Sequence, residues 1–258
     1  MLLTFIKINL LRLARDWSYL TFALGLPVFM YLIFGSTYGD QSAGDANISF
    51  YVMASMAVYG GVVATTGVAS GAATEYMQGW GRQLALTPLK PLGYVLTKVA
   101  CAMVLSAAAV ALLFVVGSVT GSQAANAGIW VATFAITWLL SSVFALYGLA
   151  VAQTLKGESA PAVASSSLVV LAFFGNLFVP LSGLMLQIAR FTPLYGYMVL
   201  VRWPFMQGHT APTYSETGVL VPGPSDPLWL AMVNVLAWTA VFGIWAAYAV
   251  RKGRRRAA

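Results

Sequence analysis

The sequence predicts an all-α membrane protein, and three observations carry that prediction. Of its 258 residues 60% are hydrophobic and only 8% are charged, which gives more apolar surface than one water-soluble core would bury. Six long stretches contain no Asp, Glu, Lys or Arg. Each is long enough to cross a hydrocarbon core of about 30 Å as a helix of ~20 residues. Finally, almost all positive charges fall on one side of these stretches.

The limits of the predicted spans follow from the positions of the charges. Asp16 and Lys98 mark the edges of spans, and the last span begins after Asp226. Since the remaining segments are short, we expect a single transmembrane domain over residues 1–258. The six spans are predicted at about residues 17–36, 48–71, 99–120, 128–153, 161–181 and 227–250.

The lysine and arginine residues predict the orientation of these spans. Twelve of the 14 lie in the N-terminal segment, the second loop, the fourth loop and the C-terminal tail, whereas only Arg190 and Arg202 lie on the other side. By the positive-inside rule, both termini are expected in the cytoplasm. The net charge of +7 is therefore explained by sidedness, and no nucleic-acid partner is expected.

Residues 1–16 precede the first span and are too short to cross a membrane. They are mostly apolar, with Lys7, Asn9 and Arg12 interspersed. This pattern favours an amphipathic helix in the inner interface, with its basic side chains reaching the headgroups of membrane lipids. A simple extension of the first span is the alternative.

The segment 74–90, after the second span, predicts a short cytoplasmic helix. Thr87-Pro88 ends the helical pattern, because the residue before a proline disfavours the helical conformation. We expect the helix to lie at the inner surface with its polar face toward the cytosol, where it could enter a cleft on a soluble partner. An ordinary interfacial loop helix fits equally well. A helical wheel places Glu75, Gln78 and Arg82 on one side and Tyr76, Trp80 and Leu84 on the other.

Several classes of chemistry lack the residues they need. The predicted span interiors hold no ionisable side chain, which argues against an ion-coupled carrier. His209 is the single histidine, and there is no metal-ligand cluster or paired carboxylate within a span. The phosphate-binding pattern G-xxxx-GK-[ST] is absent from the sequence. We therefore expect no cofactor and no enzymatic activity in this chain, and energy for any uphill transport would come from another chain.

Two motifs in the order of the chain point to a known family. Residues 75–88 read Glu-xxx-Gly-xx-Arg-x-Leu-xx-Thr-Pro after the second span, and residues 179–182 (Val-Pro-Leu-Ser), 191–193 (Phe-Thr-Pro) and then Arg202 precede the last span. Together they resemble the type-two ABC exporter permeases, the membrane subunits of bacterial export systems. The resemblance covers essentially the whole chain. One departure is Tyr76, because the family usually has Arg directly after the Glu.

The resemblance implies partners and site residues. Members pair into homo- or heterodimers of six-span subunits in the bacterial inner membrane, and each subunit docks a separate ATPase that holds ATP and Mg. The docking element is the inner helix, called the coupling helix. In the outer segment, residues 182–226, short re-entrant helices at 182–205 would help close the exit. The implied ATPase-coupling residues are Glu75, Gln78, Gly79, Arg82, Thr87 and Pro88, and those of the outer gate are Pro180, Ser182, Pro193 and Arg202.

The resemblance implies an export permease subunit powered by that ATPase. An apolar path with scattered Asn, Ser and Thr suits an amphipathic or lipid-soluble substrate, and drug or antibiotic efflux is the leading expectation. Polysaccharide or lipid export, and a non-transporting scaffold or sensory subunit, stay open. Candidate path residues in the fifth span are Phe173, Phe174, Asn176 and Phe178, although aromatic side chains there also serve packing or lipid contact.

Overall fold

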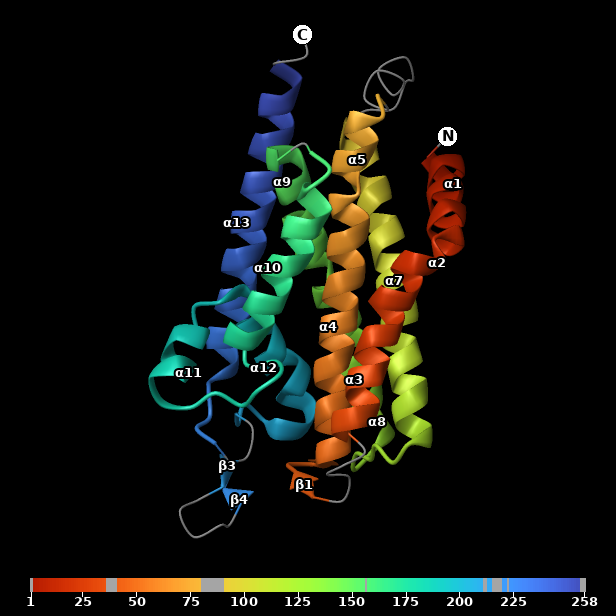
Figure 1. The fold of residues 1–258 in the computed structure, drawn as a ribbon. Coiled ribbons are helices and arrows are strands. Elements are labelled where there is room, and N and C mark those ends of the chain that lie inside the picture. Colours follow the sequence, from red (N-terminus) through yellow and green to blue (C-terminus); the bar gives the residue numbers. More distant parts are fainter. Residues whose placement is uncertain are drawn as a thin grey trace.

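A computed structural model describes most of the chain, and it shows an elongated bundle of helices. Both chain ends lie at one end of the bundle, and the hairpin strands lie at the other (Figure 1). The described residues are 2–35, 41–79, 91–155, 157–210, 213–214, 220–221 and 223–255.

Helices dominate the described residues, so the predicted all-α class is confirmed, with two short antiparallel hairpins as the only strands there. In chain order the elements are α1 (Leu2–Arg15), α2 (Trp17–Leu20), the π-helical turn η1 (Thr21–Gly25), α3 (Leu26–Gly35), β1 (Ser42–Ala43), β2 (Ala46–Asn47), α4 (Ile48–Ser70), α5 (Ala72–Met77), α7 (Pro91–Val119), α8 (Ala127–Leu140), α9 (Ser142–Leu155), α10 (Ala160–Phe174), α11 (Gly183–Ala189), α12 (Pro193–Met206), β3 (Thr213–Tyr214), β4 (Leu220–Val221) and α13 (Leu228–Arg255).

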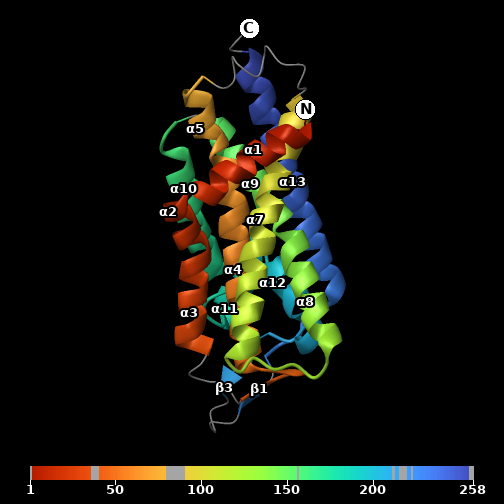
Figure 2. The same cartoon turned by 90° about the vertical axis from the view of Figure 1, so that its right-hand side faces the viewer.

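The N-terminal helix α1 is separated from the helix that joins the bundle. Asp16 separates α1 from α2, and its carboxylate accepts a hydrogen bond from the Tyr19 N–H at 3.1 Å. Figure 2 shows α1 crossing the upper part of the bundle at a slant. Pro27 has no N–H to donate to the turn before it, which fits the irregular turn η1 at that point.

Helix α4 lies at the centre of the bundle. Its first turn is capped by Asn47, whose side-chain oxygen accepts a hydrogen bond from the Phe50 N–H at 2.9 Å. It contacts α3, α7, α8, α9, α10 and α12, and most of its residues are buried. Small residues allow this close approach: a Cβ added at Gly148 of α9 would lie 2.5 Å from the Thr66 carbonyl oxygen of α4.

The number of spans is only partly settled by the helices. In the described part of the chain, four helices or continuous helix pairs are long and apolar enough to cross a membrane: Ile48–Glu75, Gly93–Val119, Ala127–Leu155 and Leu228–Ala249. The pair α11–α12, bent by 97°, would make a fifth. Thr21–Gly35 and Ala160–Phe174 are shorter apolar helices, so the count of six stays a prediction.

Two helix limits differ from the predicted ones for local reasons. Helix α7 begins at Pro91 rather than near residue 99, because a proline fits the first turn of a helix. Helix α10 ends at Phe174 rather than near residue 181. Asn176, two residues later, has a φ of 59° in the left-handed region, which ends a right-handed helix.

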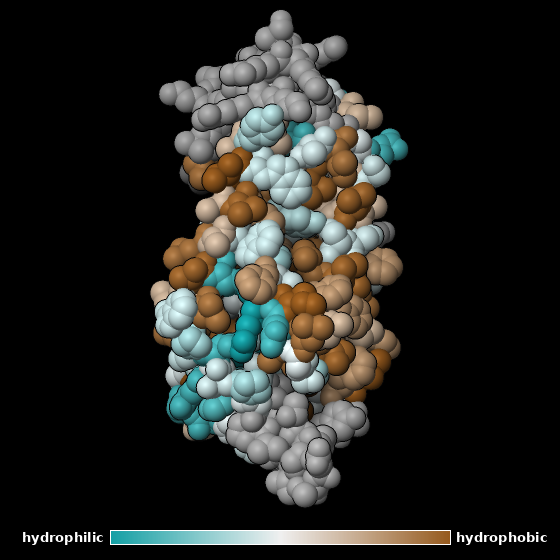
Figure 3. Space-filling view, turned by 90° about the vertical axis from the view of Figure 1, so that its left-hand side faces the viewer, coloured by the Kyte–Doolittle hydropathy of each residue, from teal (hydrophilic) through white to brown (hydrophobic). Residues whose placement is uncertain are grey.

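The outside of the bundle carries many large apolar side chains. Figure 3 shows apolar residues across the middle of the face on the α11 side. Val170 of α10 and Leu236 and Ile244 of α13 are among the exposed large hydrophobic residues. In water such a surface would be unfavourable, so its natural surroundings are lipid acyl chains.

Candidate functional site

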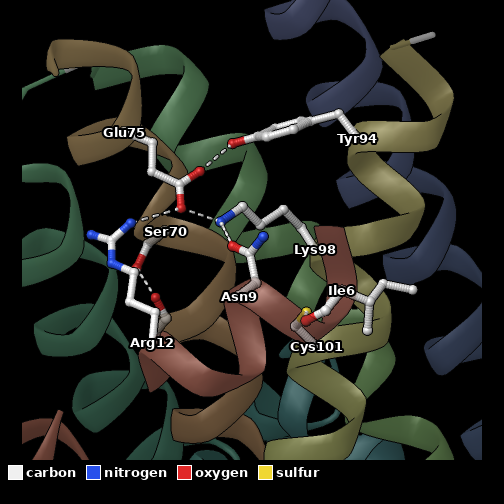
Figure 4. A network of polar contacts seen from close by, with 9 residues as sticks. Ile6, Asn9, Arg12, Ser70, Glu75, Tyr94, Lys98 and Cys101 are labelled. Carbon is white, nitrogen blue, oxygen red and sulfur yellow. Dashed lines mark hydrogen bonds and ion pairs between the residues drawn. The ribbon is translucent and has the colours of Figure 1, made fainter. Parts of the chain in front are cut away.

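Glu75 of α5 is a buried carboxylate at the end of the bundle that holds both termini. Only 7% of its surface is exposed. Helix α5 continues α4 after a turn at Gly71, and Val68 and Ala72, which lie two turns and one turn before Glu75, belong to one buried apolar cluster. Helical phase therefore points Glu75 into the bundle, toward α1 and α7 (Figure 4).

Three elements meet at the Glu75 carboxylate. Lys98 of α7, which is 4% exposed, forms an ion pair with Oε1, and its ammonium also donates to the Asn9 Oδ1 of α1 at 3.2 Å. The Tyr94 hydroxyl donates to Oε2 at 2.9 Å. Arg12 Nη1 lies 3.4 Å from Oε1, and 54% of the Arg12 side chain is exposed. We call these five side chains the Glu75 network.

The network is built from residues one helical turn apart. Asn9 and Arg12 are three residues apart on α1, and Tyr94 and Lys98 are four apart on α7, so each pair lies on one helix face. Beside them the Cys101 thiol contacts the Ile6 carbonyl oxygen at 3.8 Å. The network and this contact hold the slanted α1 against α5 and α7.

Two sequence predictions are corrected by this network. Glu75 does not face the cytosol on a separate surface helix, because α5 is a continuation of α4 and keeps its buried face. Lys98 is not at the edge of a span but within α7, where burial is possible because a carboxylate compensates its charge. In the sequence, the only sign of this network was polar residues one helical turn apart, at positions 9 and 12 and at positions 94 and 98.

The two other predicted coupling residues that the structure describes, Gln78 and Gly79, are not part of the Glu75 network. Gln78 is exposed in the turn after α5. Gly79 has a φ of 77°, a left-handed conformation that favours glycine, and a Cβ there would meet nothing within 4 Å. The remaining three, Arg82, Thr87 and Pro88, lie outside the described residues.

The residues of the predicted outer gate lie in different surroundings. Ser182 precedes α11, and Pro193 opens α12, so each lies at a helix start where its residue type is favoured. Arg202 lies within α12 and is buried at 3% exposure, which the sequence did not predict. Its guanidinium donates to the Asn176 carbonyl oxygen at 3.0 Å and to the Ser55 Oγ at 2.8 Å.

The four candidate path residues separate into two groups. Phe173 and Phe178 contact each other edge to face, with ring centroids 5.2 Å apart, and line a cavity that also reaches Pro180. Asn176 is buried, and its side-chain oxygen accepts a hydrogen bond from the Leu181 N–H at 2.9 Å. Phe174 is 43% exposed and lies outside the lining of that cavity.

An ion pair away from the Glu75 network was also not predicted from the sequence. The guanidinium of Arg190, after α11, lies 2.6 Å from a carboxylate oxygen of Asp226, just before α13. The Tyr195 hydroxyl donates to the same carboxylate. These contacts join the end of α11 and the first turn of α12 to the chain before α13, and Asp226 is 4% exposed.

The fold and the buried charge network define a class: a multi-pass α-helical membrane protein without a group of side chains able to hold a metal in its described part. The family model described as ABC-2 type transporter matches residues 2–206. The chain belongs to that family, which confirms the resemblance seen in the motifs. Membrane domains of this family are transport components whose ATPase is a separate subunit. No curated protein matches the chain.

Proposed function

We propose that this protein is the permease subunit of an ATP-driven exporter in the bacterial inner membrane, with both termini in the cytoplasm. A second permease subunit, identical or different, and a separate ATPase that binds ATP and Mg complete the transporter. The substrate class that we propose is amphipathic or lipid-soluble, with drug or antibiotic efflux first and polysaccharide or lipid export as the alternative.

The observation that carries the proposal is the continuity from Glu75 to the centre of the bundle. A force applied near Gly79 acts on α5, and α5 continues α4, the helix at the centre of the bundle. The Glu75 network joins the same point to α1 and α7. A movement of a docked ATPase would therefore reach most of the bundle through packed helices.

The test compares two glycines that share a backbone conformation. Gly79 and Gly121 both have positive φ, and a Cβ at either meets nothing within 4 Å, so proline would disturb each turn similarly. When a partner ATPase is co-expressed, Gly79→Pro should abolish co-purification of the ATPase while membrane insertion stays normal. Gly121→Pro, at the other end of the bundle, should keep it. Equal ATPase yields from both variants would contradict the proposed docking.

Transport itself separates the permease from a scaffold or sensory subunit. In inverted vesicles that contain both subunits, a fluorescent lipid-soluble drug should accumulate only when ATP is supplied. Binding of the drug without accumulation would favour the non-transporting alternative.

A further inference from the structure

A cavity of about 490 Å³ lies between α3, the first half of α4 and the chain that follows α10. Apolar side chains such as Met30, Phe34, Val52 and Phe178 form most of its wall. Its rim includes Ala43 of β1, so it lies at the end of the bundle opposite the termini (Figure 1). Its volume falls within the range of about 300–1,000 Å³ that is typical of small-molecule sites.

The polar part of the wall is in direct contact with a buried charge. Tyr51 and Ser55 line the cavity one helical turn apart on α4. The Arg202 guanidinium lies 4.0 Å from the centroid of the Tyr51 ring and donates to the Ser55 Oγ at 2.8 Å. The positive charge is therefore one side chain away from the cavity.

No carboxylate in the described part of the chain compensates that charge. The ion pairs found there join Glu75 to Arg12 and Lys98, and Asp226 to Arg190. Arg202 has instead a hydroxyl and a carbonyl oxygen as acceptors, and its buried Nε has no hydrogen-bond partner among the described residues. A buried cation without a counter-charge is costly, and ionisable groups within membrane helices commonly mark binding sites.

A purely structural role explains only part of this arrangement. The bond from Arg202 to the Asn176 carbonyl oxygen holds the left-handed turn after α10. A neutral amide could make that bond without the cost of burying a charge. The charge beside an otherwise apolar cavity has no such explanation.

We propose that the cavity binds an amphiphile with an acidic headgroup. Its apolar chain lies among the side chains of α3 and α4, its headgroup lies at Tyr51 and Ser55, and Arg202 supplies the opposite charge through a surrounding of low dielectric constant. Both a membrane phospholipid and a transported compound have this chemistry. The identification of this amphiphile as the transported substrate rests on the proposed function, whereas the binding site itself does not.

The test uses two probes with the same chain, one with an acidic headgroup and one with a neutral headgroup. A long-chain fatty acid and the corresponding fatty alcohol, each with a photoreactive diazirine in the chain, are added to the full-length protein in phosphatidylcholine nanodiscs. The acid should label residues 48–56 at a half-saturating concentration about tenfold or more below that of the alcohol, because the buried charge of Arg202 attracts the carboxylate and not the neutral hydroxyl. Equal labelling by both probes would overturn the proposal.

Variants decide whether Arg202 and the cavity are responsible. Arg202→Gln should bring the ratio of the two concentrations close to one, whereas Arg202→Lys should keep the preference for the acid. Arg12→Gln, which removes a half-exposed arginine at the other end of the bundle, should leave the ratio unchanged. Val52→Trp fills the cavity and should weaken labelling by both probes. If folded Arg202→Gln still prefers the acid over the alcohol, the proposal is contradicted. Unchanged labelling of Val52→Trp would also contradict it. The Val52→Trp variant therefore tests the proposal even if Arg202→Gln does not fold.

Two further measurements separate the sources of the ligand. If phosphatidylglycerol displaces the bound acid, a membrane lipid is an occupant of the cavity. Release of the acid on ATP addition, in the complex with the ATPase, identifies a transported compound. Binding that persists without ATP-dependent release would count against the transport function while leaving the site itself in place.

Discussion

Removing the charge of Glu75 should destabilise the protein far more than removing that of its exposed partner. Glu75→Gln keeps the shape of the side chain but leaves the Lys98 ammonium, 4% exposed, without a negative charge from the network. Leaving a buried charge uncompensated costs about 3–5 kcal/mol. Arg12 is half exposed, so Arg12→Gln should cost at most about 1 kcal/mol.

These free energies correspond to different melting temperatures. A domain of about this size loses roughly 2–4 °C per kcal/mol, so Glu75→Gln should lower the Tm by roughly 6–20 °C and Arg12→Gln by no more than about 4 °C. The Tm is measured from tryptophan fluorescence of the detergent-solubilised protein. Because the network holds α1 beside Cys101, Glu75→Gln should also speed maleimide labelling of that buried thiol.

A double variant tests whether the uncompensated charge is the cause. Glu75→Gln with Lys98→Met removes both members of the buried pair, so no buried ammonium remains and the Tm should recover most of the loss. Equal Tm values for Glu75→Gln and Arg12→Gln would refute the reasoning. So would a double variant that is no more stable than Glu75→Gln alone.

Two further predictions concern packing and orientation. Gly148→Val should lower the Tm by several degrees, because its Cβ would lie 2.5 Å from a backbone oxygen of α4, whereas Gly243→Val, whose Cβ meets its nearest atom at 3.9 Å, should have little effect. With Cys101→Ala as background, a cysteine at Glu158 should react with a membrane-impermeant maleimide only in inverted vesicles and one at Gln123 only in intact cells. Labelling on the opposite sides would overturn the proposed orientation.

The sequence was sufficient for the class of the protein because hydropathy is a local property. Stretches without charge predict helices in lipid whatever their neighbours are, and the helices at α4, α7, α8–α9 and α13 lie where such stretches were found. The helix at residues 2–15 likewise follows from local pattern. The family followed from motifs that are continuous in the chain.

The surroundings of the charges could not be predicted in this way. The positions of the charges placed Lys98 at a span edge and Arg202 on the outer side, but they did not predict that both side chains are buried. Whether a charge can be buried depends on partners that folding brings from distant segments, such as Glu75 for Lys98, 23 residues away, and Ser55 for Arg202, 147 residues away.

The sequence by itself thus determined that this chain is a helical membrane protein of a transporter family. Both conclusions depend on local patterns, namely apolar stretches between charged segments and motifs that are continuous in the chain. Only the tertiary structure decided which charges are neutralised. It joins α1, α5 and α7 around one carboxylate. It also places Arg202 beside an apolar cavity, where no carboxylate of the described residues forms an ion pair with it. The physical reason is that the free energy of a buried charge is set by the groups within a few ångströms of it.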